Sequence, residues 1–177
     1  YEEVVENLLN VGEGDPMSSD VIFRAFPEYH ASLGFDACAN WAFRMVTTKC
    51  PLEEKMTLFW HSVFPTGNDK LNNPVSCLNQ IDTFRECSMG RFDDILLKLS
   101  KDPAMLIYLD NQTNHGDSIN ENYGREILEL FSLGVGNYTE DDIKECARAF
   151  TGWSVKNAEY MALRAENDSI WPYSRTG

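Results

Sequence analysis

The sequence predicts an all-α fold, a single multi-helix domain of orthogonal or bundle-like arrangement with about eight helices joined by short loops. Three observations lead to this prediction. Apolar residues recur at three- and four-residue spacing along most of the chain. Residues that start or stop helices interrupt this pattern at short intervals. Alternating strand patterns are almost absent.

The N-terminal part of the chain predicts two helices. The first covers Glu2–Val11 and ends at the turn cluster Gly12–Pro16. Ser18 or Ser19 can cap a second helix that runs toward Pro27, because serine side chains accept hydrogen bonds from free N–H groups at a helix start.

Three longer helices are predicted in the middle of the chain. Phe35–Lys49 has its apolar residues on one face. Pro51 then begins a helix over Leu52–Phe64, since proline is favoured at the first helical position and glutamates in the first turn suit the helix dipole. Pro65–Asp69 is expected to be a loop, and Val75–Met89 is expected to be helical again.

The next segments alternate helices with a polar loop. Arg91–Lys101 is amphipathic, and Asp102 followed by proline is a strong start signal for Ala104–Leu109. Asp110–Ser118 is a polar loop rich in asparagine. Glu121–Leu133 is then predicted to be a helix that glycines terminate.

The last predicted helix begins at a recognisable cap. Thr139–Asp142 resembles a capping box, with aspartate in place of the usual glutamate, and opens the helix Asp141–Phe150. Beyond Trp153 the apolar periodicity weakens.

Charge and hydropathy exclude several classes of function. Fifteen Lys and Arg against 28 Asp and Glu give a formal net charge of −13. This balance argues against nucleic acid as a partner, because phosphate binding relies on clustered basic residues, and equally against an anionic membrane surface. It is compatible with cationic partners, with metal ions or simply with solubility. No stretch approaches the roughly 18 apolar residues of a transmembrane helix.

The five cysteines do not form a known motif. No C-x-x-C pair is present, so the sequence supports neither a zinc ribbon nor a thioredoxin-type site. We expect free, mostly buried thiols.

Four blocks of sequence resemble one known family. They are Leu52-Glu-Glu-Lys-Met-Thr-Leu-Phe-Trp-His61, Asp102-Pro-Ala-Met-Leu-Ile-Tyr-Leu-Asp-Asn111, Asn120-Glu-Asn-Tyr-Gly-Arg-Glu-Ile-Leu-Glu-Leu-Phe131, and the segment from Leu133-Gly-Val-Gly-Asn-Tyr-Thr-Glu140 through Ala147-Arg-Ala-Phe-Thr-Gly-Trp153. In this order they resemble the uncharacterised bacterial family called domain of unknown function eighteen-hundred.

The resemblance implies organisation and setting more than activity. Residues 1–177 are expected to be one helical domain fragment, with N-terminal helices in 1–50, the family core in 51–153 and an irregular, truncated tail in 154–177. Members are usually longer and often carry export signals, which implies a periplasmic or secreted protein and leaves the cytoplasm open. They often neighbour a second uncharacterised, sulfatase-related family, a possible source of a protein partner. Members commonly have a second histidine two residues after the one matching His61, where this chain has Val63.

An asparagine-rich region offers candidate binding residues. Read as an EF-hand loop from Asp110, the segment fails because its sixth position is His115 and not glycine. Another hard-cation site is a weaker alternative to an ordinary loop in which Asn and Asp bind the backbone. Trp153 joins the set, although a core or helix-end aromatic is the simpler interpretation. The candidate binding residues are Asn111, Asn114, Asn120, Asn122 and Trp153.

Candidate catalytic residues come from two helices. Glu121 and Arg125 share one helix face with Glu129, and Glu126 lies in the adjacent row. Such a group can tune an acid–base pair or form a structural ion-pair ladder, and the ladder is the commoner case. His61 could act as a ligand or proton shuttle, but no metal-binding partner occurs on its helix, and a satisfied core histidine is the plainer alternative.

Two functional hypotheses follow. In the first, the chain is a partner-binding helical module of an exported or envelope-associated bacterial protein. In the second, it is a metal-dependent or acid–base hydrolase-like enzyme whose site includes His61 and the 121–126 face and is completed by a further C-terminal segment. No metal ligand set and no cofactor can be named. Convergence of His61 and the 121–126 face in one pocket would favour the enzyme.

Overall fold

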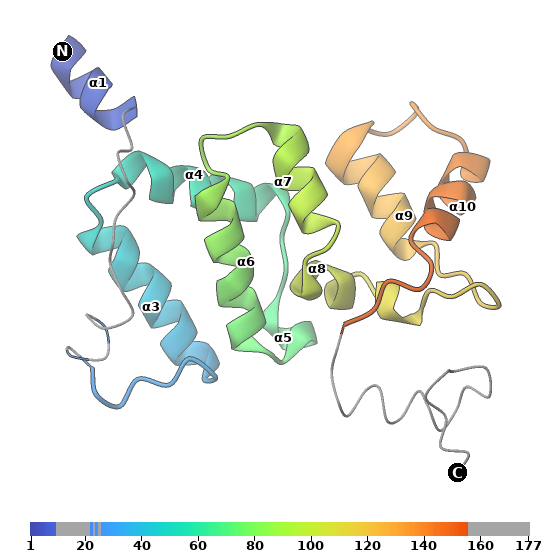
Figure 1. Cartoon of the computed structure of the whole chain (residues 1–177), viewed down its shortest axis with the longest axis horizontal. Helices are drawn as coiled ribbons and strands as arrows, with labels where there is room; N and C mark the ends of the chain where they lie inside the picture. Colours follow the sequence, from blue (N-terminus) through green and yellow to red (C-terminus); the bar gives the residue numbers. More distant parts are fainter. Residues whose placement is uncertain (10–21, 23, 25, 156–177) are drawn as a thin grey trace.

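The structure is a computed structural model that describes residues 1–9, 22, 24 and 26–155 (Figure 1). The regular elements of these residues are all helices, and no strand occurs among them; one isolated bridge joins His115 and Ser118. The all-α prediction is therefore confirmed.

The helices follow one another with short connections. They are α1 (Glu2–Leu9), α3 (Gly34–Thr47), α4 (Pro51–Val63), α5 (Asn68–Leu71), α6 (Pro74–Glu86), α7 (Phe92–Leu99), α8 (Pro103–Tyr108), the 3-10 helix η1 (Asn111–Thr113), α9 (Asn122–Glu126), the π-helix η2 (Ile127–Ser132) and α10 (Glu140–Ala149).

The predicted helix caps are present. The Asp102 carboxylate accepts a hydrogen bond from the Met105 N–H at 2.8 Å, and Pro103 is the first residue of α8. At α10 the Thr139 hydroxyl accepts from the Asp142 N–H, and the Asp142 carboxylate accepts from the Thr139 N–H. Both caps satisfy N–H groups that a helix start leaves free.

Two segments differ from the sequence prediction. The expected loop Pro65–Asp69 contains the start of the short helix α5. The expected regular helix Glu121–Leu133 is divided into α9 and η2, because its second half widens to a π-helix. The proposed cap at Ser18 or Ser19 lies outside the described residues, as does the tail from residue 156 onward.

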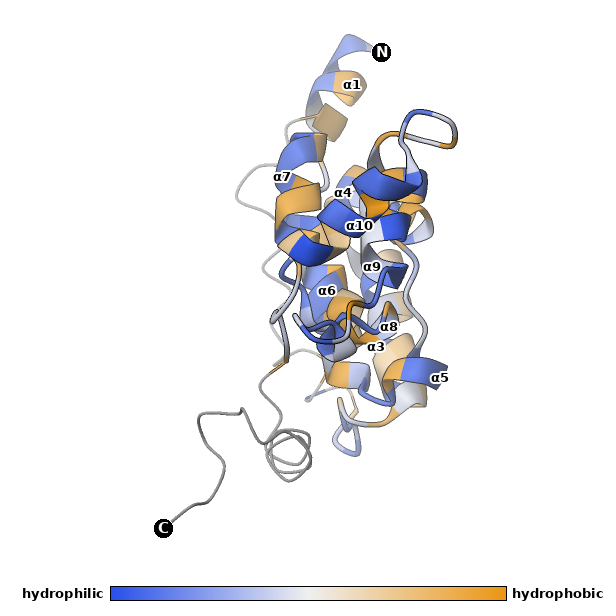
Figure 2. Ribbon diagram, turned by 90° about the vertical axis from the view of Figure 1, so that its right-hand side faces the viewer, coloured by the Kyte–Doolittle hydropathy of each residue, from blue (hydrophilic) through white to orange (hydrophobic). Residues whose placement is uncertain are grey.

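The helices form two groups that meet in the middle. Helices α3, α4 and α6 pack together, while α9 packs against α10, and α7 and α8 lie between these groups (Figure 1). The ribbon of α10 is largely hydrophilic (Figure 2), in keeping with its acidic first turn.

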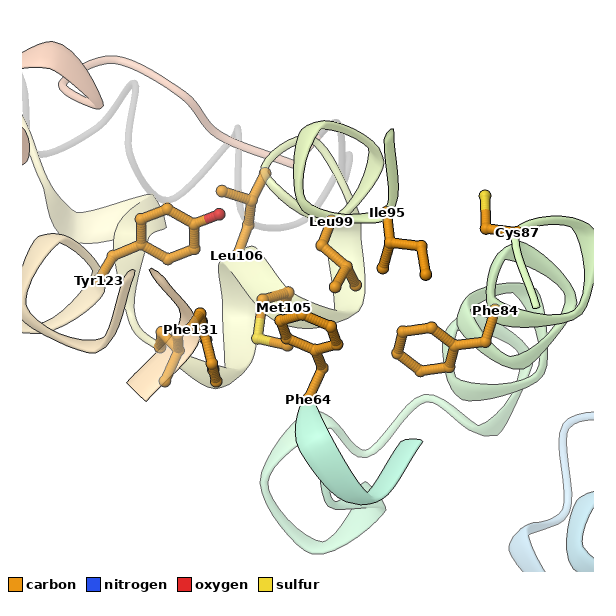
Figure 3. Close-up of a cluster of buried hydrophobic side chains, with 10 residues drawn as sticks. Phe64, Phe84, Cys87, Ile95, Leu99, Met105, Leu106, Tyr123 and Phe131 are labelled. Atoms are coloured by element: carbon orange, nitrogen blue, oxygen red, sulfur yellow. The ribbon is translucent and has the colours of Figure 1, made fainter. Parts of the chain in front are cut away.

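The hydrophobic core joins the two groups. Phe64 is fully buried, with its ring centroid 6.2 Å from Phe84 and 5.1 Å from Phe131. Side chains from α6 to η2 form one buried cluster with it (Figure 3). They are Phe84, Cys87, Ile95, Leu99, Met105, Leu106, Leu109, Tyr123 and Phe131.

A buried ion cluster holds α3, α4 and α6 together. The Glu54 carboxylate, 3% exposed, accepts hydrogen bonds from Arg44 Nε at 2.9 Å and Trp41 Nε1 at 3.3 Å. Arg85 donates to the same carboxylate through Nε and, at 3.2 Å, through Nη2. Arg85 also pairs with Asp82. Each helix of the group therefore contributes charge to one site.

Two further predictions can be compared with the structure. All five cysteines are free thiols, as expected, but only Cys87 is buried and Cys38 is exposed, so the expectation of mostly buried thiols is wrong. Among the described helices, none has the length and apolar character needed to cross a membrane.

Candidate functional site

The asparagine-rich loop between α8 and α9 is a closed hydrogen-bond network. Asn111 and Asn114 are completely buried. Asn111 Nδ2 donates to the carbonyls of Phe150 and Trp153, both at 3.2 Å. Asn114 Nδ2 donates to the Ala147 carbonyl at 2.8 Å. These two amides therefore satisfy carbonyls at and just beyond the end of α10, groups that a helix end otherwise leaves without partners.

The other two asparagines close the loop from the opposite side. Asn120 Nδ2 donates to the Asp110 carbonyl at 3.3 Å and to Thr113 Oγ1 at 2.9 Å. Asn122 Nδ2 donates to the Leu109 carbonyl at 3.1 Å. The four candidate asparagines thus take part in one loop, and their amide groups bond to the protein itself.

Trp153 takes part in this network through its backbone and not through its indole ring. Its backbone carbonyl accepts the bond from Asn111, while its side chain is 42% exposed. The neighbouring Gly152 N–H donates to the Asn114 carbonyl at 3.0 Å, and its positive φ of 82° is one that glycine adopts readily. Hydrogen bonds to the backbone of Gly152 and Trp153 therefore hold the segment after α10 against the asparagine-rich loop.

The charged face of α9 lies at the surface. Arg125 Nη2 lies 2.8 Å from a Glu140 oxygen and 3.4 Å from a Glu121 oxygen. All three side chains are at least one-third exposed. The bond to Glu140 raises the Arg125 pKa and lowers that of Glu140. This pattern is an exposed ion-pair ladder between α9 and α10.

Glu126 occupies the junction between α9 and the π-helix. No hydrogen bond or ion pair joins its carboxylate to another residue that the structure describes. Partial burial, followed by the nearby charge of Glu129, raises the pKa of Glu126. Glu129 itself accepts a 2.7 Å hydrogen bond from the Tyr138 hydroxyl. π-Helical turns inside α-helices are frequent at functional sites.

His61 lies in a different part of the molecule. Its ring meets Trp41 edge-on at a centroid distance of 5.3 Å and lies 6.2 Å from Phe84. The Nδ1 atom is buried without a hydrogen-bond partner in the described structure, and burial lowers the pKa of the imidazole. His61 lines a cavity of about 150 Å³ between α3, α4 and α6, together with Cys38 and Cys77.

The candidate catalytic residues fall into two separate places. His61 lies in the α3–α4–α6 group, whereas Arg125 and Glu126 belong to α9 and Glu121 directly precedes it; α9 packs on α10 (Figure 1). None of these α9 residues lines the cavity that contains His61. Within the described part of the chain, no group of three or more His, Cys, Asp and Glu side chains could hold a metal ion.

Sequence reasoning missed an exposed aromatic surface. Phe59 and Phe92 are 49% and 44% exposed, and both contact the partly buried Trp60. A signal for it exists in the sequence. Neighbouring residues on a helix point about 100° apart, so Phe59 and Trp60 cannot both face the core centrally.

The described part of the chain is thus an all-helical protein whose helices are held together by buried asparagine amides and by the ion cluster around Glu54. The chain belongs to the family described as Protein of unknown function (DUF1800), whose model matches residues 6–171. This match confirms the resemblance found in the four sequence blocks. No curated protein matches the chain, and no solved structure matches it.

Proposed function

We propose that this chain is a partner-binding module that binds a basic, amphipathic segment of another protein. The binding region is an exposed aromatic surface formed by Phe59, Trp60, Met89 and Phe92, called the aromatic surface below. The observation that carries the proposal is the continuity of this surface across the start of α7 and the outer side of α4.

Ring contacts join the three aromatic side chains of this surface. Trp60 has its ring centroid 5.0 Å from Phe59 and 6.1 Å from Phe92. Met89, 45% exposed, follows Ser88, whose carbonyl accepts a 3.0 Å hydrogen bond from Trp60 Nε1. This bond and the stacking of Trp60 on Phe64 fix the indole in place.

A fixed aromatic surface suits protein binding. Aromatic residues and methionine are enriched at the centres of interfaces, and tryptophan is prominent among residues that dominate binding energy. Because Trp60 is already held, little side-chain entropy is lost on association. The net charge of −13 favours a partner segment that carries basic residues around its apolar face.

Site-specific crosslinking tests this proposal. A photoreactive phenylalanine analogue replaces Phe59 in the full-length protein expressed in its native host, with Leu130 as the matched control because it is 65% exposed on η2. We expect a discrete crosslinked partner from position 59 only, and its loss when Phe92→Ala is added. A member of the sulfatase-related neighbouring family is the first identity to check.

The chemistry of the captured partner decides the outcome. A crosslinked segment that is basic and amphipathic, and that binds the purified chain as a peptide, supports the proposal. A crosslink to a second copy of the chain, or equal crosslinking from positions 59 and 130, contradicts it.

A second candidate function rests on a separate observation, the position of Glu126 at the start of the π-helix with no hydrogen-bond or ion-pair partner among the described residues, where partial burial raises its pKa. A carboxyl group that holds its proton at higher pH suits general-acid chemistry, as a hydrolase needs. His61 does not support this function at the same site. If a substrate screen on the full-length protein finds hydrolysis, Glu126→Gln should abolish it without lowering the melting temperature. Full activity in that variant would remove this candidate.

A further inference from the structure

We propose that a cavity between residues 26–29 and α3 binds a small organic cation with a quaternary ammonium head. The cavity has a volume of about 330 Å³ and is separate from both sites described above. Its walls combine aromatic rings with carboxylates. The lining residues on which the argument rests are Phe26, Glu28, Tyr29, Phe35, Asp36 and Phe43.

The aromatic rings are arranged around the cavity and partly fixed. Phe26 and Phe43 meet edge to face, with centroids 5.8 Å apart and an interplanar angle of 87°. The Tyr29 hydroxyl accepts a 2.8 Å hydrogen bond from Asn40 Nδ2, which orients the phenol ring from α3. Phe35 lies at the start of α3 and is 85% exposed. Four aromatic rings therefore line this cavity, and a cation over the face of such a ring is attracted by the ring's negative charge density.

Two carboxylates give the cavity its charge preference. Asp36 Oδ2 accepts a 2.8 Å hydrogen bond from the His30 N–H, which fixes the side chain. None of the described residues donates to the other Asp36 oxygen. Glu28 is exposed at the edge of the same cavity. Two carboxylates in the lining of one cavity favour a positively charged ligand over a neutral or acidic one.

The apolar walls select the kind of cation. Most of the lining is carbon, so a strongly hydrated metal ion would lose water without gaining ligands, and the described residues supply no three-ligand group here. A quaternary ammonium head is large, weakly hydrated and cannot donate hydrogen bonds, so rings and one or two carboxylates suffice to hold it. The cavity volume lies at the small end of the range for ligand sites, which suits a ligand of only a few non-hydrogen atoms.

The test compares the binding of a cation with the binding of its neutral isostere. Choline and 3,3-dimethylbutan-1-ol have the same shape, but a carbon replaces the charged nitrogen in the second. Each is titrated into the isotope-labelled chain, and binding is followed by backbone NMR shifts of residues such as Ala39 and Asn40. We expect saturable shifts around this cavity, with choline bound at least about tenfold more tightly.

Variants separate charge from ring contributions. Asp36→Asn keeps an oxygen that can accept from His30 but removes the charge, and Phe35→Leu removes a ring from an exposed position. Each should weaken choline binding by about fivefold or more, in line with one cation–π or charge contact. The matched controls Asp93→Asn and Leu130→Ala, both at exposed positions that do not line this cavity, should leave it unchanged.

Three results would overturn the proposal. One is equal affinity for choline and its neutral analogue, which would make the cavity merely apolar. The second is the absence of saturable shifts at α3. The third is tighter binding of a lysine-containing peptide than of choline in the same titration, with the same sensitivity to Asp36→Asn, which would assign the cavity to a protein ligand.

Discussion

Charged groups are used differently in the two helix groups of this molecule. In the α3–α4–α6 group, Glu54 is buried and receives hydrogen bonds from Arg44, Arg85 and Trp41. In the α9–α10 group, Arg125 pairs with Glu140 and Glu121 at the surface. There the buried polar contacts are made by neutral asparagine amides.

This difference indicates where electrostatics hold the fold. A buried carboxylate with arginine partners is costly to disrupt, because removing one member leaves the others charged and desolvated. An exposed pair is screened by water and salt and contributes little. Substitution in the buried cluster around Glu54 should therefore lower stability far more than substitution in the exposed pairs of Arg125.

The largest expected effect comes from Glu54→Gln. The neutral amide cannot balance Arg44 and Arg85, and its NH₂ group faces donors where the carboxylate accepted. We expect the free energy of unfolding to fall by about 3–5 kcal/mol, measured by urea denaturation. The control is Glu145→Gln, which removes one partner of the exposed pair with Arg148 and should change little. A loss in Glu54→Gln no greater than in the control would show that the cluster is not structural.

We expect the contact between α9 and α10 to be disrupted by a change in packing more than by the loss of a charge. A Cβ atom on Gly124 would lie 2.9 Å from the Ala147 nitrogen and 3.2 Å from the Ile143 carbonyl oxygen, both backbone atoms. Gly124→Ala must therefore push the two helices apart, at a cost of about 1–3 kcal/mol. The matched control is Gly116→Ala, where a Cβ atom meets nothing within 4 Å. Equal melting temperatures for the two variants would mean that the helices do not cross this closely.

In the α3–α4–α6 group, substitution of His61 should have a smaller effect on stability, and this effect should depend on pH. Burial lowers its pKa from 6.5, so the unfolded chain binds a proton at His61 before the folded chain does. The stability that neutral His61 provides is complete above pH 6.5 and is lost as the pH falls through the lowered value. His61→Gln should flatten the stability profile in this acidic range, whereas Ser62→Ala, at the exposed neighbour, should not. An unchanged profile in His61→Gln would assign the acid sensitivity to other groups.

Local sequence signals predicted the secondary structure well. The caps at Asp102 and Thr139 depend on residues three apart in sequence, so spacing alone was enough to find them. The π-helix was not predictable in this way. The apolar spacing of Ile127–Ser132 predicted an ordinary α-helix, whereas the structure has a π-helix there, in which Phe131 contacts the distant Phe64.

The candidate sites were less predictable because they depend on distant segments. Glu53 and Glu54 look equivalent in the sequence, as first-turn acids of α4. Only the arrival of Arg44 from α3 and Arg85 from α6 makes Glu54 the buried one. Likewise the asparagine density around Asn114 was visible, but its use in binding the Ala147 carbonyl depends on the position of α10.

The smallest expected effect is that of Arg125→Ala, and it distinguishes the two interpretations of the α9 ladder. Because Arg125, Glu121 and Glu140 are exposed, their attraction is screened, and the variant should melt at nearly the same temperature as the parent chain. Raising the salt concentration should reduce even this difference, since exposed charges are screened within about 10 Å at 0.1 M salt. A variant that unfolds, or whose melting temperature drops equally at high salt, would show that Arg125 is held as firmly as Arg85, and the contrast between the two helix groups would disappear.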